Sequence, residues 1–591
     1  MKKTFHNRYK GIGKQPWLVA GRTQKMARHY VRSTLCVALA TTVDSLVAGW
    51  QIGSDALAAI SAVAPLLAIG QILHCLLAFG IEKIMIQHIG RGERREANRV
   101  FGTVLIAIFA VHLIVFIPVI IFERPILSLF ITDPALVDLA IIYSVPILIF
   151  SPLFEVFLCI ERAFRIDGRA ALLSSRAIVM NLCNILLDYL LVSVFGMGIS
   201  GLAWASVIGS AIGYCLPLSH FFSKKRTVSP DLSVIWAPRE MAGYLKRDII
   251  MGSSATLEEL LETRVITTQT AVISGLGGVS GLAIFAIYKT LKGVIIAISN
   301  GIAASVSVHT GLLFGTQNYT SVKNSVKTGI GYATAVCVTF VAGIMIFAEP
   351  LGSAFNIDPS SLSLFSQCIR FGSAAFPGLM LSVIMGAYLP AVGKNLLANI
   401  LVFIQKGLMF LATAAGFIQS QVWFYRLYTG AALLTGVVIV ILLIHNKNWF
   451  MPKDIPDMIG EFSLRLLPEY FPEVSKSMYS LLKEFAYGET LASRTALVAE
   501  ETLSYIRKQN PDREVAADIE LKQCEQGAAL RILDDGITYN PINDWAEVIR
   551  PDPEHFENII IMDLTAEVKY DRVLDLNNLV LIINDPQSIS L

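Results

Sequence analysis

Residues 125–134 read Pro-Ile-Leu-Ser-Leu-Phe-Ile-Thr-Asp-Pro, and 225 positions later residues 350–359 read Pro-Leu-Gly-Ser-Ala-Phe-Asn-Ile-Asp-Pro. The two stretches agree at both prolines, the serine, the phenylalanine and the aspartate, and the same gapless offset carries Gly90 onto Gly315. An internal repeat of long apolar segments is typical of a membrane transporter built from two related halves. We therefore expect a substrate to bind between the halves, and we expect the chemistry to lie where the two copies differ.

Composition excludes an ordinary soluble protein. The chain has 591 residues, of which 54% are hydrophobic and 16% charged, and its mean hydropathy is +0.59. These values lie far outside the soluble range. Residues 1–32 carry nine Lys or Arg and no acid, and they lack the short apolar core and cleavage site of a signal peptide. We interpret them as a basic cytoplasmic tail, and the net charge of +2 gives no reason to expect a nucleic-acid partner.

Twelve apolar runs are long enough to cross a bilayer. They lie near residues 33–52, 57–88, 99–122, 135–160, 170–195, 199–222, 249–274, 279–310, 326–348, 361–390, 395–418 and 423–446. The fold class expected is an all-α polytopic membrane protein with twelve transmembrane helices in two six-helix repeats. We call residues 33–222 the N-lobe and residues 248–447 the C-lobe, with a cytoplasmic linker at 223–247.

The distribution of basic residues predicts the orientation. The connections at 91–99, 162–176 and 223–247 hold several Arg or Lys each, whereas the alternating connections 53–56 and 275–281 hold none. The positive-inside rule therefore places both termini in the cytoplasm. We expect a multi-pass protein of a bacterial inner membrane that contacts the lipid bilayer throughout.

A second domain follows the last span. Residues 448–459 form a linker with two prolines, and residues 460–591 change abruptly to amphipathic helices followed by alternating strands near 515–523, 528–534, 567–573 and 578–584. About 130 residues suffice for one domain with its own core. We expect a small α/β sandwich on the cytoplasmic side, which we call the tail domain.

Two motifs resemble the multidrug and toxic compound extrusion (MATE) family over roughly residues 30–446. One begins at Asp44-Ser45-Leu46-Val47-Ala48-Gly49, and the other runs from Asn184-Ile185-Leu186-Leu187-Asp188-Tyr189 to the Gly196–Ser206 passage. The resemblance implies a six-plus-six helical transporter with a central cavity. It also implies export of small organic, often cationic compounds against an inward flow of H⁺ or Na⁺.

A cation site is predicted in the N-lobe. A central carboxylate in a bilayer costs several kcal/mol and is a functional candidate by default. Asn184 and Asp188 share one helix face, and with Asp44 they offer carboxylate and amide oxygens to Na⁺, or coupled carboxylates to a proton. Ser206 falls where the resemblance implies a hydroxyl. The alternative is that Asn184 and Asp188 only bond helix to helix.

The repeat predicts that this site is one-sided. Adding 225 sends Asp44 to Gln269, Asn184 to Met409, Asp188 to Thr413 and Ser206 to Ala431, so the C-lobe copy has lost both carboxylates.

Other charged residues lie in the spans. Glu258, Glu259 and Glu262 in the seventh span, with Lys289 and Lys292 in the eighth as partners, are candidates for substrate or proton binding, or for a paired structural network. The resemblance implies a seventh-span glutamate at Glu262. We interpret Glu161 beside Arg162 as an ion pair near the membrane surface, and Glu155 as a weaker candidate. His74, His112 and His309 stand alone in the sequence, so we expect them to be structural.

The tail domain resembles the histidine-kinase-like ATPase fold in its anti-sigma-factor form, through residues 499–506 and 533–541. The resemblance implies nucleotide-pocket roles for Glu501, Asp534 and Gly536. However, the position of the metal-binding Asn is Tyr505, and the lid region near residue 554 lacks glycines. We expect no cofactor, weak or absent ATP binding, and a regulatory role through a cytoplasmic protein partner.

The function predicted is a secondary active exporter of organic compounds coupled to H⁺ or Na⁺, not an enzyme. Two alternatives stay open. One is a lipid-linked saccharide flippase of the same superfamily, because Lys289 and Lys292 supply cationic groups. The other is a membrane-anchored sensor whose tail domain signals. A phosphate-binding loop for ATP-driven export is missing, since Gly386 and Gly393-Lys394-Asn395 have the wrong spacing and ending.

Overall fold

The computed structural model forms two compact units. One is the helical unit Thr23–Phe450, and the other joins Met1–Arg22 with Met451–Leu591. The structure describes residues 18–584 except for short gaps. These gaps are 52–53, 91–92, 129–132, 168, 223–227, 316–318, 356, 358, 417–419, 447–457, 525–526, 540, 543–555 and 574–575. The side chains of residues 38–51, 54–58, 61–62, 64–65, 90, 170, 217, 219–221, 279, 320, 354, 458, 556–558 and 573 also lie outside the description.

The N-lobe is an array of long helices. Its elements are α1 (Leu18–Gln51), α2 (Ser54–Gly90), α3 (Arg94–Ile121), α4 (Glu123–Ser128), α5 (Pro134–Ile166), α6 (Ala170–Asp188), the π-helix η2 (Tyr189–Val194) and α7 (Ile199–Phe221). The bounds agree with the predicted spans except at the start. Helix α1 begins at Leu18, well inside the segment 1–32 that we expected to be a tail.

The C-lobe repeats this order. Its elements are α8 (Pro238–Gly315), α9 (Tyr319–Ala354), η4 (Pro359–Ser361), α10 (Leu362–Ser373), α11 (Phe376–Ala391), α12 (Asn395–Gly416) and α13 (Gln421–His445). Helix α8 contains two passages, because Gly278 has φ 54° and breaks it there. Only glycine adopts that backbone region readily. Ten described segments are long and apolar enough to cross a membrane, and α1 and the first part of α8 complete the two six-helix repeats.

The repeated Asp-Pro has a local role as a helix start. Asp133 precedes α5, and its side chain accepts a hydrogen bond from the Ala135 amide at 2.9 Å. Pro134 occupies the first helical position, where its missing N–H has no partner to lose. In the second copy Asp358 lies outside the described residues, and Pro359 begins the short η4 before α10.

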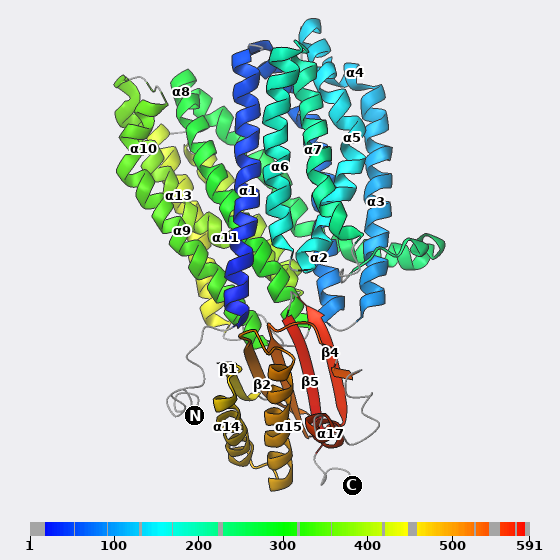
Figure 1. The fold of residues 1–591 in the computed structure, drawn as a ribbon. Coiled ribbons are helices and arrows are strands. Elements are labelled where there is room, and N and C mark those ends of the chain that lie inside the picture. Colours follow the sequence, from blue (N-terminus) through cyan, green and yellow to red (C-terminus); the bar gives the residue numbers. More distant parts are fainter. Residues whose placement is uncertain are drawn as a thin grey trace. The chain divides into compact units, whose positions relative to one another are not determined.

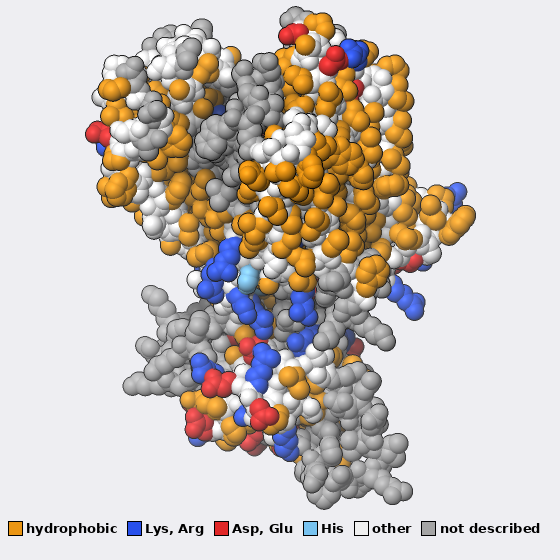
Figure 2. All heavy atoms as spheres, turned by 45° about the horizontal axis from the view of Figure 1, so that its top comes forward, with side chains coloured by type: hydrophobic (Ala, Val, Ile, Leu, Met, Phe, Trp, Pro, Cys, Tyr) orange, Lys and Arg blue, Asp and Glu red, His pale blue; other side chains and the backbone are white. Residues whose placement is uncertain are grey.

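The outward faces of the helices are apolar. Ile114 and Ile121 on α3 and Ile444 on α13 are 70%, 68% and 72% exposed. Figure 2 shows hydrophobic side chains covering the visible sides of the helical bundles almost continuously. A surface of this kind is expected where side chains face lipid rather than water.

The two lobes meet along a seam at the end where α2 finishes and α8 begins, and they diverge toward the opposite end (Figure 1). On one side of the seam, Ser305 of α8 donates to the Thr23 carbonyl of α1 at 2.8 Å. On the other, a Cβ added to Gly80 of α2 would collide with the Asp248 carbonyl of α8. These two contacts are repeat copies of each other, since Thr23 and Gly80 lie 225 positions before Asp248 and Ser305.

The seam is narrow because its residues are small. A Cβ on Gly252 would lie 2.6 Å from the Leu76 carbonyl oxygen, and one on Gly301 would lie 2.5 Å from the Val31 amide. Small residues let helix backbones approach closely in a membrane. Lys83 and Gln87 add hydrogen bonds to the Met251 and Ala391 carbonyls at 3.3 and 3.2 Å.

The predicted linker 223–247 is partly fastened to the N-lobe. The amides of Ser229 and Asp231 donate to the side chain and the carbonyl of Asn98 at 2.9 and 3.0 Å. After the short η3 (Leu232–Trp236), α8 begins at Pro238, so the seventh passage starts inside the predicted linker. Arg99 and Glu240 then form an ion pair at 2.6 Å.

The tail domain is a five-stranded antiparallel sheet with helices on one face. Its strands are β1 (Met458–Arg465), β2 (Ala516–Cys524), β3 (Gly527–Asp534), β4 (Glu567–Val573) and β5 (Leu576–Asn584), in the order β1-β2-β3-β5-β4. Its helices are α14 (Phe471–Glu484), α15 (Glu489–Lys508) and α17 (Phe556–Leu564). Alternate residues such as Leu530 and Ile532 join Met478 and Leu503 in the core. The four predicted strands are confirmed within a few residues, whereas β1 starts inside the predicted linker.

Candidate functional site

The predicted cation site begins with a contact between α6 and α7. The Asn184 amide nitrogen donates to the Ser206 hydroxyl at 3.3 Å, and the Asn184 carbonyl oxygen has no hydrogen-bond partner among the described residues. Gly209 of α7 allows the two helices to lie this close, because a Cβ there would be only 3.1 Å from the backbone nitrogen of Asn184. The structure therefore brings two of the predicted residues together and leaves an amide oxygen available.

Asp188 lies one turn further along α6 and is 1% exposed. It is the last residue of the α-helix, and the chain continues as the π-helix η2 before turning at Gly196 and Gly198, both at positive φ. A π-helical turn widens the helix locally and often marks a functional position. A buried carboxylate at such a junction fits a cation or proton site.

Asp44 belongs to α1, but its side chain lies outside the described residues, so its approach to Asp188 stays a prediction. At the positions of the C-lobe that correspond to Asn184 and Asp188, the side chains are a methionine and a threonine. Met409 and Thr413 are fully buried in α12, where the Thr413 hydroxyl donates to the Met409 carbonyl at 2.7 Å. That hydroxyl is therefore satisfied along its own helix.

The C-lobe holds a different polar cluster, centred on Glu262. One carboxylate oxygen accepts from Lys292 at 2.6 Å and the other from Lys406 at 2.8 Å. Lys406 is also 3.9 Å from Glu258. The predicted pair of Glu262 and Lys292 is present, whereas the other expected partner, Lys289, lies 6.0 Å from the centre of the Phe285 ring.

Lys406 is the residue that sequence reasoning missed in this cluster. Its side chain is 7% exposed. A charged residue in the middle of the apolar span 395–418 indicates a functional or paired group, and this was the sequence signal that could have identified it. Glu262 is 23% exposed and Glu258 is 37% exposed, so the carboxylates are the more accessible part of the cluster. Glu259 is partly exposed and has no ion pair among the described residues.

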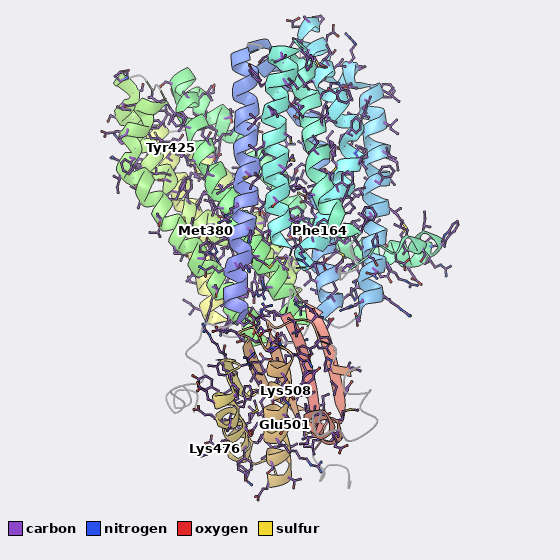
Figure 3. The ribbon with its side chains drawn as sticks, in the orientation of Figure 1. Phe164, Met380, Tyr425, Lys476, Glu501 and Lys508 are labelled. Carbon is purple, nitrogen blue, oxygen red and sulfur yellow. The ribbon has the colours of Figure 1, made fainter. Side chains whose placement is uncertain are left out.

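A group of buried tyrosines lies next to the C-lobe cluster. Lys292 is 5.8 Å from the centre of the Tyr428 ring, and Tyr288 meets the Tyr425 and Tyr428 rings edge-on at 5.3 and 6.1 Å. Figure 3 labels Tyr425 within the helices of this lobe. These rings pack against one another in the interior of the C-lobe.

The N-lobe contains a buried ion-pair network that the sequence did not reveal. His74 contacts Glu155 at 2.6 Å and Arg162 at 3.1 Å, and Arg162 and Arg165 both donate to Glu82 at 3.1 and 3.3 Å. His74 stands alone in the sequence but has two charged partners in the structure. Its partners are 81 and 88 residues away, so no local spacing could have shown them.

Glu161 does not pair with its neighbour Arg162. It pairs instead with Arg176 of α6, and both are buried. Adjacent residues on a helix point in directions about 100° apart, so a partner on another helix has the better geometry. His112 and His309 fit the structural expectation more closely, since each imidazole contacts the carbonyl four residues earlier at 2.8 Å.

In the tail domain, the aspartate that resembles an adenine-binding residue, Asp534, is already hydrogen-bonded to other groups of the protein. Asp534 is fully buried and accepts hydrogen bonds from the Gly536 amide, the Asn577 amide and the Tyr539 hydroxyl at 2.9, 2.7 and 2.7 Å. Burial raises the pKa of Asp534, and these three donors oppose that rise. Asp534 therefore belongs to an internal hydrogen-bond network, and its role in a nucleotide pocket stays a prediction.

Three tyrosine rings pack together beside Asp534. Tyr539 packs edge-on to Tyr505 at 5.6 Å and tilted to Tyr570 at 5.2 Å. Glu501 lies on α15 (Figure 3) and is partly exposed. No group of three or more His, Cys, Asp or Glu capable of holding a metal occurs among the residues that the structure describes.

The two-lobed helical fold, with buried polar sites in each lobe, defines a membrane transporter. A family model, MatE, matches the chain twice, over residues 31–190 and 255–415. The second match begins 224 and ends 225 positions after the first, in agreement with the repeat offset. The chain therefore belongs to the MatE family. A comparison with curated protein sequences gave no match.

Solved structures share the fold of the helical unit. A mutant of the Vibrio cholerae MATE transporter VcmN gives a TM-score of 0.67 at 15% identity, covering 73% of this chain and 99% of that one. An outward-facing multidrug resistance MATE family transporter of the MOP superfamily gives 0.65 at 19% identity, with 73% and 97% covered. A Pyrococcus furiosus MOP superfamily transporter, described as having a binding pocket of reverse polarity that suggests a different function, gives 0.65 at 18% identity, with 73% and 97% covered.

Proposed function

We propose that the protein is a secondary active antiporter that exports small organic compounds in exchange for inward movement of H⁺ or Na⁺. The observation that carries the proposal is the pairing of Asn184 with Ser206 beside the buried Asp188, in the N-lobe only. The coupling cation binds there, with Asp44 as a further ligand. Alternating access then follows from movement of one lobe against the other about the seam.

The C-lobe supplies the substrate-facing groups in this proposal. Glu258 and Glu259 are the carboxylates available to an organic cation, because both oxygens of Glu262 are held by lysines. Three carboxylates against Lys292 and Lys406 leave one negative charge in the cluster, which suits a monovalent cationic group.

The orientation proposed has both termini in the cytoplasm, as the basic connections predict. The end of the bundle where α2 finishes and α8 begins is then cytoplasmic. Because the lobes touch at that end and diverge at the other, the conformation described here corresponds to the outward-facing state. The inner membrane of a bacterium is the proposed location.

A lipid-linked saccharide flippase is the second candidate, favoured by the ammonium groups of Lys292 and Lys406 inside the C-lobe. The reverse pocket polarity described for the Pyrococcus furiosus relative supports keeping it. Such a substrate carries phosphate groups, which would have to displace Glu262 from both lysines. We expect the intact triad to resist that exchange, so we rank export of small organic compounds first.

The tail domain is proposed to regulate transport through a protein partner and not through nucleotide. Because Asp534 is fully buried and already accepts three hydrogen bonds, an adenine amine would have to open this packed network to reach it. A titration of the full-length protein with Mg-ATP in a calorimeter should therefore give little or no heat, and no ATPase activity should appear. A micromolar dissociation constant would contradict this and favour nucleotide-gated transport.

The function is tested with purified full-length protein in proteoliposomes and a fluorescent organic cation, ethidium. We expect accumulation driven by either an imposed Na⁺ gradient or an imposed pH gradient, and abolished in Asp188→Asn. The variant Thr413→Ala, at the repeat copy of Asp188, serves as the matched control. Movement of a fluorescent lipid-linked saccharide without either gradient would instead support the flippase. Retained ethidium export after removal of residues 451–591 would rule out the sensor alternative.

A further inference from the structure

The buried network around His74 is not explained by the cation site at Asp188. His74 of α2 lies between two residues of α5, with Nδ1 2.6 Å from a Glu155 carboxylate oxygen and Nε2 3.1 Å from an Arg162 guanidinium nitrogen. Its ring also meets Phe79 edge-on at 5.7 Å. The His74 residue is 6% exposed, so these partners determine its state.

The hydrogen-bond chemistry assigns the histidine's tautomer. A guanidinium only donates, so Nε2 of His74 must accept from Arg162 and carries no proton in this arrangement. Nδ1 then carries the hydrogen and donates to Glu155. The imidazole is neutral, with one lone pair held by a cation that must move away before that nitrogen takes up a proton.

The four charged side chains of the network balance one another. Glu155 and Glu82 are opposed by Arg162 and Arg165, and Glu82 accepts from both arginines. From α3, His112 is near enough to interact electrostatically with His74 and Glu155. Glu155 is the most open carboxylate of the set, with 12% of its side chain exposed against 6% for Glu82.

The network belongs to one repeat only. The positions 225 residues beyond His74, Glu82, Glu155 and Arg162 are Ser299, Ser307, Met380 and Ala387. Figure 3 labels Met380, which is buried in α11 at the position that corresponds to Glu155. Helix packing alone does not need these charges, because the C-lobe builds the equivalent contact without any of them.

We propose that His74 and Glu155 form a second proton-binding site of the N-lobe, separate from Asp188, with Arg162 as its displaceable counter-charge. This inference rests on the proposed function of a cation-coupled exporter. A proton binds to Nε2 of His74, the hydrogen bond from Arg162 to that nitrogen breaks, and Arg162 keeps its bond to Glu82. The product is an imidazolium paired with the Glu155 carboxylate.

The site is placed to affect the seam between the lobes. Arg165, which shares Glu82 with Arg162, lies 5.3 Å from the centre of the Tyr30 ring on α1. The backbone at Tyr30 and Val31 is the surface against which Gly301 of the C-lobe packs. Protonation of His74 changes how the two arginines share Glu82, and this change lies one side-chain layer from the inter-lobe contact.

The test is nuclear magnetic resonance of full-length protein in nanodiscs with isotopically labelled histidine, which needs no substrate. The His74 signal is assigned by its loss in His74→Gln. In wild type at neutral pH we expect the Nδ1–H tautomer. In Arg162→Gln we expect a several-fold larger protonated fraction of His74 at the same mildly acidic pH, and in Glu155→Gln a several-fold smaller one. The His309 signal, from the C-lobe, should change in neither variant.

An Nε2–H tautomer in wild type, or equal protonated fractions in all three proteins, would overturn the inference. A transport readout separates the site from a structural tie between helices. In proteoliposomes with ethidium and a pH gradient, Glu155→Gln should flatten the dependence of export on external pH, and Glu155→Asp should restore part of it. An unchanged pH profile in Glu155→Gln also overturns the proposal. Export that fails in wild type under every gradient would instead contradict the proposed function, which the resonance experiment does not depend on.

Discussion

The N-lobe and the C-lobe have the same order of helices but place their charges on different ones. Among the described residues, the buried charges of the N-lobe lie on α2, α4, α5 and α6, and those of the C-lobe lie on α8 and α12. One contact shows the divergence directly. Asn181 of α6 donates to the Cys36 carbonyl of α1 at 2.6 Å, and its repeat copy, Lys406 of α12, forms the ion pair with Glu262 of α8. The same pair of helices is joined in both lobes by different chemistry.

The comparison teaches which parts of the sequence are set by the membrane. Helix starts, close-packing glycines and apolar faces recur in both copies because every passage must satisfy its own backbone in lipid. Buried charges are not needed for that purpose, and each one costs free energy. The charges that appear in only one copy therefore carry the functional asymmetry. Asp188 against Thr413 and His74 against Ser299 are the sharpest examples.

The largest effect on export should come from removing the charge of Asp188, which has no acidic counterpart in the C-lobe. Asp188→Asn keeps the size of the side chain but removes its charge, so it should abolish gradient-driven ethidium export. Expression and folding should persist, because the asparagine amide is less costly to bury than a charge. Thr413→Ala should leave most of the export, since the Thr413 hydroxyl donates to the Met409 carbonyl of its own helix. Normal export by Asp188→Asn would show that the lobes do not differ in coupling.

The next effect concerns the seam, where the two lobes are copies of each other. Gly80→Val and Gly301→Val both place a side chain against the backbone of the opposite lobe. Overpacking costs about 1–3 kcal/mol, which corresponds to roughly 5- to 150-fold in the equilibrium between closed and open seams. We expect both variants to slow ethidium export.

A matched control for the seam is Gly430→Val on α13, because a Cβ there would meet no atom within 4 Å. Accessibility of a cysteine introduced at Met251 to a water-soluble maleimide measures the seam directly. Both seam variants should increase its labelling rate, whereas the control should not. An effect confined to one of the two glycines would contradict the symmetric seam.

A smaller effect on stability should distinguish the two versions of the contact between the first and fifth helices of each lobe. Lys406→Met leaves Glu262 paired with Lys292, so the loss should be about 1.5–3 kcal/mol, the range for one hydrogen bond to a charged group. Asn181→Ala removes one hydrogen bond to a carbonyl and should cost about 1 kcal/mol. Thermal unfolding of the two purified variants in detergent gives the comparison. Equal losses would mean that the ion pair is no stronger a tie than the amide.

Sequence reasoning reached the fold because the strong signals are local or periodic. The spans, the repeat offset and four strands of the tail domain follow from hydropathy and alternation, and Asn184 with Ser206 came from motif position. What it missed depends on contacts between distant segments. The role of Lys406 becomes visible only through its contact with Glu262 on α8, and that of His74 through its contacts with Glu155 and Arg162 on α5. The early start of α1 was also missed, because a basic, amphipathic helical turn looks like a tail when no partner is visible.

The tail domain differs from both lobes in that its buried charges lie outside the membrane-spanning segments. The pH dependence of its stability can therefore be used to measure the free-energy cost of burying one of them, Asp518. On β2, Asp518 accepts from Ser463 at 2.6 Å and from the Leu18 amide at 3.3 Å. Burial raises the pKa of Asp518 to about 6 from its ordinary value of 3.8. The folded domain therefore binds this proton more tightly than the unfolded chain, so its stability is highest below about pH 4 and falls as pH rises through about 6.

Asp518→Asn should remove that loss, because the amide oxygen still accepts both hydrogen bonds and carries no charge. At pH 7 we expect the variant to be roughly 2–3 kcal/mol more stable than wild type, and nearly equal to it at pH 4. Hydrogen–deuterium exchange of β2 and β3 in the full-length protein, corrected for intrinsic rates, measures the difference. Asp512→Asn, at an exposed position, should change nothing. A variant less stable than wild type at pH 7 would mean that the Asp518 charge holds the first turn of α1 to the tail domain and is not merely tolerated there.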